Sequence, residues 1–200
     1  MKSFTRLNAW LVTAAGLGLA MVPAAVASAG TAQSAAPAMA SHQAGAVRPA
    51  LVLPFTCGIV ANNTGRYLSA VDGGGRTTNV IRTNEKTLRS WEKFTFIDSG
   101  DGSNPVHYGI RTDNLHYLTA VGGGGYAVSP DGTDAVHSNA PNLDSWEKFS
   151  LISRGNGLYA LQTINGHFIT ATGGGNQTSD AIHANATAMD SWELFRLDCI

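Results

Sequence analysis

Three tryptophans of this chain stand beside a glutamate in the same five-residue phrase, Ser-Trp-Glu-x-Phe, at 90–94, 145–149 and 191–195. An aromatic ring can stack on the apolar face of a pyranose ring, and a neighbouring carboxylate can accept hydrogen bonds from sugar hydroxyls. Each copy could therefore form one shallow ligand-binding site. The candidate pairs are Trp91 and Glu92, Trp146 and Glu147, and Trp192 and Glu193.

A structural role is the alternative for the same residues. The tryptophan can pack under a glycine-rich hairpin, and the glutamate can satisfy buried backbone donors. If the phrase is an extended strand, Glu92 shares a face with Phe94 and Trp91 lies on the other face. Burial is therefore expected more for the glutamates than for the tryptophans.

An asparagine precedes each tryptophan by seven positions, and these residues are Asn84, Asn139 and Asn185. A side-chain amide can bridge adjacent sugar hydroxyls, so the asparagines join the candidate ligand-binding residues. The sequence favours the alternative, in which each asparagine caps a turn through an Asx hydrogen bond.

Metal binding and catalysis have little support in the sequence. Histidines occupy repeat positions that hold an arginine in the first copy, and the two sets are Arg66, His116 and His167, and Arg82, His137 and His183. Arginine does not ligate metals, so we expect polar surface there and no metal site. No nucleophile motif occurs, and the three glutamates stand on separate repeats, too far apart for an acid–base pair. We predict no catalytic residue, no enzyme activity and no cofactor.

The three phrases end three longer repeats. Each phrase is preceded by a strand-like run, at 66–70, 116–120 and 167–171, and by a glycine block, at 73–75, 122–125 and 173–175. The aromatic residue of the run precedes the tryptophan by 24 positions in the outer copies and by 29 in the middle copy. The five extra residues fall within 126–133, a turn-like surface sequence.

These repeats predict an all-β protein. Apolar and polar residues alternate with period two between turn residues, and no stretch shows sustained helical periodicity. Phe94, Phe149 and Phe195 are the expected core members. Three such units, at about 55–100, 106–155 and 157–200, with the chain ends meeting, predict a closed β-trefoil with pseudo-threefold symmetry.

Residues 1–29 resemble a secretory signal peptide, with a basic start, a short apolar run and Ala27-Ser28-Ala29 as the cleavage pattern. An uncleaved anchor is the alternative. Residues 30–50 have the composition of a flexible Ala/Ser/Pro-rich leader, and 51–200 form the single folded domain. We therefore expect a secreted monomer that is free of the membrane after signal cleavage.

The charge and the cysteines agree with secretion of the protein. Without the signal segment, 11 basic residues stand against 14 acidic ones and no Lys/Arg run occurs, so no nucleic-acid partner is expected. Cys57 and Cys199 bracket the repeats. In an oxidising compartment they are expected to form a disulfide between the first and last strands, and two free buried thiols are the alternative.

The succession Tyr-Leu-x-Ala, Gly-Gly-Gly, Asn and Trp-Glu-x-Phe resembles the fascin-like branch of the β-trefoils, the actin-crosslinking-like superfamily, over about 55–200. That superfamily includes actin-bundling proteins and β-glucan-binding modules of secreted bacterial enzymes. The leading hypothesis is a lectin-like protein that binds a β-glucan or another cell-wall polysaccharide. The alternatives are an actin cross-linker, and a trefoil protease inhibitor or protein-interaction module that uses the insertion at 126–133.

Overall fold

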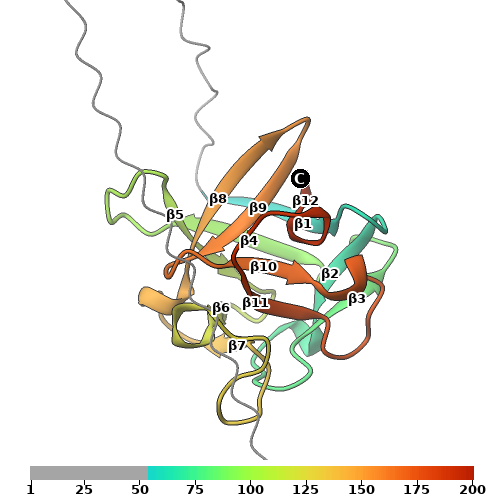
Figure 1. The fold of residues 1–200 in the computed structure, drawn as a ribbon, viewed down its shortest axis with the longest axis horizontal. Helices are drawn as coiled ribbons and strands as arrows, with labels where there is room; N and C mark the ends of the chain where they lie inside the picture. Colours follow the sequence, from blue (N-terminus) through green and yellow to red (C-terminus); the bar gives the residue numbers. More distant parts are fainter. Residues whose placement is uncertain (1–53) are drawn as a thin grey trace, which may run out of the picture. The chain divides into compact units, whose positions relative to one another are not determined.

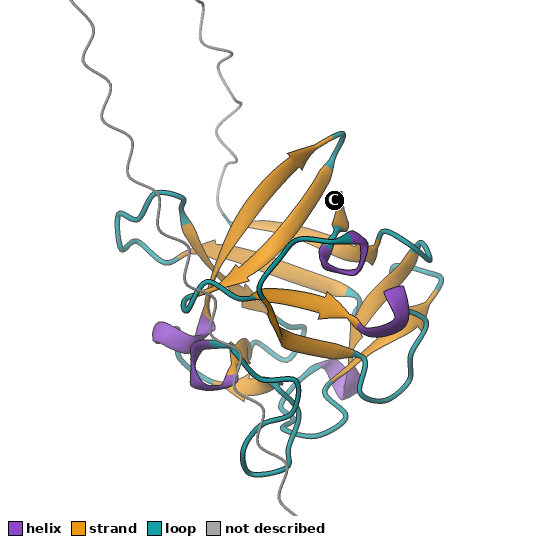
Figure 2. Cartoon of the chain, viewed as in Figure 1, coloured by secondary structure: helices purple, strands orange, loops and turns teal. Residues whose placement is uncertain are grey.

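The computed structural model describes residues 54–200, so the predicted signal peptide and leader lie outside the described residues. The described chain consists of short strands joined by turns and single 3₁₀ turns (Figure 2). No helix in this part of the chain has the length and apolarity needed to cross a membrane. The strands are β1 (Phe55–Ala61), β2 (Arg66–Ala70), β3 (Ile81–Glu85), β4 (Lys93–Asp98), β5 (His107–Arg111), β6 (Tyr117–Ala120), β7 (Val136–Ala140), β8 (Lys148–Gly155), β9 (Leu158–Thr163), β10 (Phe168–Ala171), β11 (Ile182–Ala186) and β12 (Phe195–Cys199). The 3₁₀ turns are η1 (Val71–Gly73), η2 (Val121–Gly123), η3 (Ser145–Glu147), η4 (Thr172–Gly174) and η5 (Ser191–Glu193).

Six of the strands close into a barrel. Strand β1 pairs with β4, β4 with β5, β5 with β8, β8 with β9, β9 with β12, and β12 with β1 again, all antiparallel. Strands β8 and β9 form a long hairpin that is easily followed in Figure 1. Because the ring returns to β1, neither of its two terminal strands is left as an open edge.

The other six strands form three hairpins, one for each repeat. They are β2–β3, β6–β7 and β10–β11, and each joins the barrel through its first strand. A six-stranded barrel with three such hairpins is the β-trefoil that the repeats predict. The extra residues of the middle copy fall in the loop between β6 and β7, where Val128 and Asp134 form an isolated bridge.

The core confirms the expected phenylalanines. Phe94, Phe149 and Phe195 are at most 2% exposed. Each is the first or second residue of the barrel strand that follows its Trp-Glu turn. Apolar residues from the barrel strands and from all three hairpins line a common void of only about 10 Å³. The repeats thus share one core, and none of them has a separate one.

The chain ends are joined covalently. Cys57 lies opposite Cys199 in the β1–β12 ladder, and their sulfurs form the predicted disulfide. The bond spans 142 positions of sequence, so it ties the first barrel strand to the last.

The glycine blocks connect neighbouring repeats. Gly75 donates its backbone N–H to the carbonyl of Ser138, and Gly125 donates to the carbonyl of Ala184 in the same way. Asn176, directly after the third block, closes the cycle, because its N–H bonds to the carbonyl of Thr83. Gly74 has a φ of +109°, and a β-carbon there would collide with Thr112. The block therefore requires glycine both for its backbone conformation and for close approach.

Candidate functional site

Each Trp-Glu pair lies in a turn just before a barrel strand. In the second and third repeats the pair belongs to η3 and η5, and in the first it occupies a turn before β4. The expectation that the phrase is an extended strand was wrong for its Trp and Glu residues in all three repeats. The chain bends here because the glutamate side chain reaches back to a backbone N–H three residues earlier, which is a helix-start arrangement.

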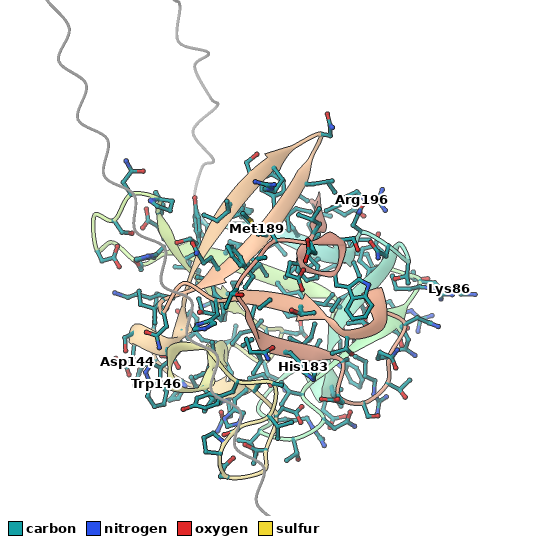
Figure 3. The ribbon with its side chains drawn as sticks, viewed as in Figure 1. Lys86, Asp144, Trp146, His183, Met189 and Arg196 are labelled. Carbon is teal, nitrogen blue, oxygen red and sulfur yellow. A yellow bond between two sulfur atoms is a disulfide. The ribbon has the colours of Figure 1, made fainter. Side chains whose placement is uncertain are left out.

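The turn separates the two side chains of the pair. Trp91, Trp146 and Trp192 are 44%, 47% and 47% exposed, and their partner glutamates are only 4–6% exposed. Figure 3 shows Trp146 at the periphery of the ribbon near Asp144. The tryptophans therefore present their rings to solvent, and the glutamates are available mainly to the protein.

The buried glutamates of the second and third repeats are fully engaged. Glu147 accepts a 2.7 Å hydrogen bond from the hydroxyl of Thr119 and a 3.0 Å bond from the N–H of Asp144. Glu193 repeats this arrangement with Thr170 and Asp190. Both carboxylates thus fasten the tryptophan turn to the neighbouring hairpin, which is a structural role.

The first repeat departs from this arrangement at two positions. Serine replaces threonine at Ser69, and Arg89 replaces the aspartate that precedes the phrase. The Arg89 N–H still donates to Glu92, at 2.9 Å, but among the described residues no side chain donates to this carboxylate. One oxygen of Glu92 is therefore left without a protein partner.

A pocket of about 290 Å³ lies beside Trp91. The residues that line it come from β2, η1, β3 and the turn before β4, and they are Ser69, Val71, Arg82, Glu85, Arg89, Ser90, Trp91 and Glu92. Arg82 lies directly opposite Ser69 in the β2–β3 ladder, so the small serine and the long arginine share one wall. The pocket combines an aromatic surface with charged donors and acceptors.

The charged groups of this pocket are not paired with one another. Within residues 54–200, none of Arg82, Arg89, Glu85 and Glu92 forms an ion pair, and the buried Nε of Arg82 has no hydrogen-bond partner. Buried polar atoms are nearly always satisfied by protein or by another molecule. The Nε of Arg82 and the second carboxylate oxygen of Glu92 are therefore available to bond to a ligand.

The three asparagines occupy one structural position that the sequence did not reveal. Each is the second of two strand residues that oppose a single residue of the paired strand, which is a β-bulge. None of the three side chains forms an Asx hydrogen bond in the described chain, so the turn-capping role was wrong. Asn84 is not among the residues that line the pocket, whereas Asn139 and Asn185 are exposed.

Three of the six cationic and histidine positions make polar side-chain contacts, whereas Arg82, His116 and His167 each have a buried ring or guanidinium nitrogen without a partner among the described residues. His137 contacts the hydroxyl of Thr133 at 2.8 Å, and His183 contacts Asp180 at 2.9 Å. Arg66 donates to the carbonyl of Asn84. Residues 54–200 contain no group of three side chains suited to hold a metal ion.

A separate ionic cluster lies on the loop before β5. Asp101 bonds to His107 at 2.9 Å and to Lys148 at 3.0 Å. Hydrogen bonds from His107, Ser103 and Lys148 hold the pKa of Asp101 well below its usual range. Since Lys148 begins β8, this carboxylate connects the loop to a barrel strand.

The comparisons with known proteins agree with the architecture. No protein-family model and no curated protein matches the chain. The designed threefold symmetric protein ThreeFoil is 15% identical, with a TM-score of 0.59, over 72% of this chain and 99% of its own. The agglutinin of Rhizoctonia solani is 12% identical, with a TM-score of 0.56, over 76% and 100%. An exo-β-1,3-galactanase of Clostridium thermocellum, 1,3Gal43A, is 15% identical, with a TM-score of 0.57, over 73% of this chain and 30% of the enzyme. Identities this low show a shared fold, and the chain is a β-trefoil.

Proposed function

We propose that this protein is a secreted, non-catalytic, lectin-like carbohydrate-binding protein, whose ligand is a β-glucan or another cell-wall polysaccharide. The observation that carries the proposal is the exposure of Trp91, Trp146 and Trp192, each nearly half exposed at the same position of its repeat. A single exposed apolar side chain is common on a protein surface, but here a large aromatic ring is exposed at the same position of all three repeats. The threefold repetition makes a chance exposure a poor explanation.

Three separated aromatic sites suit a polymer. A polysaccharide bound at one tryptophan holds its neighbouring segments near the others, so weak individual sites combine through effective concentration. Shallow stacking surfaces also tolerate a chain that continues beyond the site, whereas a closed pocket would not. The agglutinin and a part of the galactanase named above have the same fold, which is consistent with this role but is a likeness of fold alone.

Membership of the fascin-like branch is part of the same proposal. It rests on the repeated Tyr-Leu-x-Ala, glycine-block and Trp-Glu-x-Phe residues, which form the hairpin, the inter-repeat loop and the exposed turn of each repeat. Actin binding, the other activity in that branch, is tested by co-sedimentation with filaments. Sedimentation with actin and no retention on glycans would replace the proposal.

The test is retention of the full chain on insoluble β-1,3-glucan, cellulose, chitin and peptidoglycan. A Trp91→Ala/Trp146→Ala/Trp192→Ala variant is compared with Leu115→Ala, which removes an exposed apolar side chain outside the phrases. We expect retention by the native protein and by the control, and its loss in a folded triple variant. Failure of the native protein to bind any of these polymers would overturn the proposal.

The insertion at 126–133 in the second repeat is the alternative binding surface, and it would contact a protein partner. Val128 is 53% exposed on this loop, which makes the loop a possible contact for a protein partner. Shortening the loop by five residues gives it the length of the other copies. If polymer retention then disappears while the tryptophan substitutions have no effect, the glycan sites are not at the tryptophans.

A further inference from the structure

We propose that the pocket of the first repeat binds a single neutral sugar residue, and that Ser69 is the residue that opens this pocket. The inference rests on the proposed carbohydrate-binding function and deepens it. It distinguishes the Trp91 site from the sites at Trp146 and Trp192, which the sequence repeats present as equivalent. The structure shows that they differ at the glutamate.

The size of the residue at position 69 controls the space beside Glu92. Thr119 and Thr170 place a hydroxyl 2.7 Å from the carboxylates of Glu147 and Glu193. Ser69 lacks the γ-methyl group, lines the pocket, and has no such bond to Glu92. The first repeat therefore leaves a carboxylate oxygen and a serine hydroxyl at the pocket wall, where the other repeats have a closed pair.

The second substitution changes the chemistry around this space. Where Asp144 and Asp190 precede the other phrases, the first repeat has Arg89, a cationic residue that lines the pocket. Arg82 provides another from the opposite strand, and its buried Nε lacks a protein partner. A sugar hydroxyl that accepts a hydrogen bond from Arg82 would satisfy that donor.

The balance of charge points to a neutral ligand. The residues that line the pocket include two arginines, Arg82 and Arg89, and two glutamates, Glu85 and Glu92. Because the two signs of charge are equal in number, neither an anionic nor a cationic sugar gains a net attraction here, and each would bring a like charge close to its own charged group. A hydroxyl both donates and accepts, so a neutral polyhydroxylated ring can bond to all four groups while it lies against Trp91.

The volume limits the ligand to a small one. At about 290 Å³ the pocket is at the lower end of small-molecule sites, which span roughly 300–1,000 Å³. We therefore assign it to one sugar residue, either free or at the end of a chain. The tryptophan turns of the other repeats remain open surfaces for internal segments of a polymer.

The experiment is a titration of the full chain with methyl β-D-glucopyranoside, methyl β-D-galactopyranoside and N-acetyl-D-glucosamine. Glucuronate and glucosamine are the anionic and cationic comparisons. Binding is followed through the indole N–H resonances of the tryptophans, assigned with single Trp→Phe variants. We expect at least one neutral sugar to shift Trp91 saturably, with smaller or no shifts at Trp146 and Trp192, and to bind at least tenfold more tightly than either charged sugar.

Ser69→Thr is the decisive variant, because it installs the residue that the other repeats already carry. We expect the affinity of the neutral sugar to fall at least tenfold, with no loss of thermal stability. Thr119→Ser, the reverse change in the second repeat, should leave the response of Trp91 unchanged.

The pocket proposal and the proposed function can fail separately. No shift with any neutral sugar, equal shifts of the three indoles, tighter binding of a charged sugar, or full affinity in Ser69→Thr would each overturn the pocket proposal. If retention on polysaccharide persists in any of these cases, the proposed function stands without the pocket. If polymer retention is absent as well, the proposed function falls too.

Discussion

The hydroxyl of Thr119 donates a 2.7 Å hydrogen bond to the buried carboxylate of Glu147, and so ties the β6–β7 hairpin to the turn that exposes Trp146. Thr170 and Glu193 make the same connection in the third repeat. Each bond adds a side-chain donor to the glutamate that lies beside the exposed tryptophan. The first repeat lacks this hydrogen bond, and there Ser69 stands in place of threonine and Arg89 in place of aspartate.

Removal of this hydrogen bond should destabilise the second repeat. In Thr119→Ala the carboxylate of Glu147 stays buried and loses one of its two donors, so the free energy of unfolding should fall by about 1–3 kcal/mol. Urea denaturation measures the change. Ser69→Ala is the matched control and should cost less than about 0.5–1 kcal/mol, because Ser69 makes no equivalent bond. Equal losses in the two variants would show that the bond contributes nothing specific.

Comparison of single and double tryptophan variants should reveal whether the sites bind the polymer together. Because each ring is nearly half exposed, Trp146→Ala and Trp192→Ala should leave the thermal midpoint close to that of the native protein. Removal of two rings together should reduce the apparent affinity for the retained polysaccharide by about 10²-fold or more, since the advantage of multiple attachment disappears. Depletion assays on the insoluble polymer measure this. If the double Trp→Ala variant lost no more affinity than a single Trp→Ala variant, multivalent binding would be excluded.

The disulfide should contribute strongly to stability. Replacement of Cys57 and Cys199 by alanine opens a link across 142 positions, and the chain-entropy relation gives a loss of about 3–5 kcal/mol. Guanidinium denaturation of the oxidised protein, the reduced protein and the double variant measures it. Reduction should weaken the native protein to about the level of the variant and leave the variant unchanged. A variant as stable as the oxidised protein would contradict this expectation.

The Asp101 cluster should make stability depend on acid pH. Its carboxylate has a folded-state pKa below that of the unfolded chain, which is about 4, so its contribution is present above that pH. As the pH falls from about 5 toward the depressed folded pKa, the unfolded state takes up the proton first and the contribution is progressively lost. Thermal midpoints measured between pH 7 and 2 should therefore fall less steeply in Asp101→Asn than in the native protein.

Asp113 provides the comparison for that pH series. It is exposed and has no hydrogen-bond or ion-pair partner among the described residues. Asp113→Asn should keep the native acid dependence. If both asparagine variants follow the native curve, the contacts of Asp101 with His107 and Lys148 do not act on folding.

Much of the architecture could be predicted because it repeats along the chain. The period-two alternation placed Phe94, Phe149 and Phe195 in the core, and the three co-linear copies predicted the trefoil before any contact was known. The pairing of Cys57 with Cys199 followed from their positions outside the repeats. These features depend on local periodicity and on the order of segments, which one sequence contains in full.

Other features depend on distances through space. Trp91 points outward because its turn is held by Glu92, whereas the alternation of a strand predicted the same separation for a different reason. The asparagines occupy bulges, which become visible only when two strands are laid in register. Sequence-based prediction treats each residue within its own segment, so neither the turn nor the bulge could be derived from it.

The sequence by itself therefore determined a threefold all-β chain with a repeated tryptophan, a shared core and joined ends. Only the tertiary structure showed that the glutamate of the first repeat lacks the hydrogen bond that the other two make. Ser69, Arg82 and Arg89 come from two strands and a turn, and their differences from the other repeats look minor in sequence. They form a pocket because folding brings them around one buried carboxylate, where the absence of a single methyl group leaves space for a ligand.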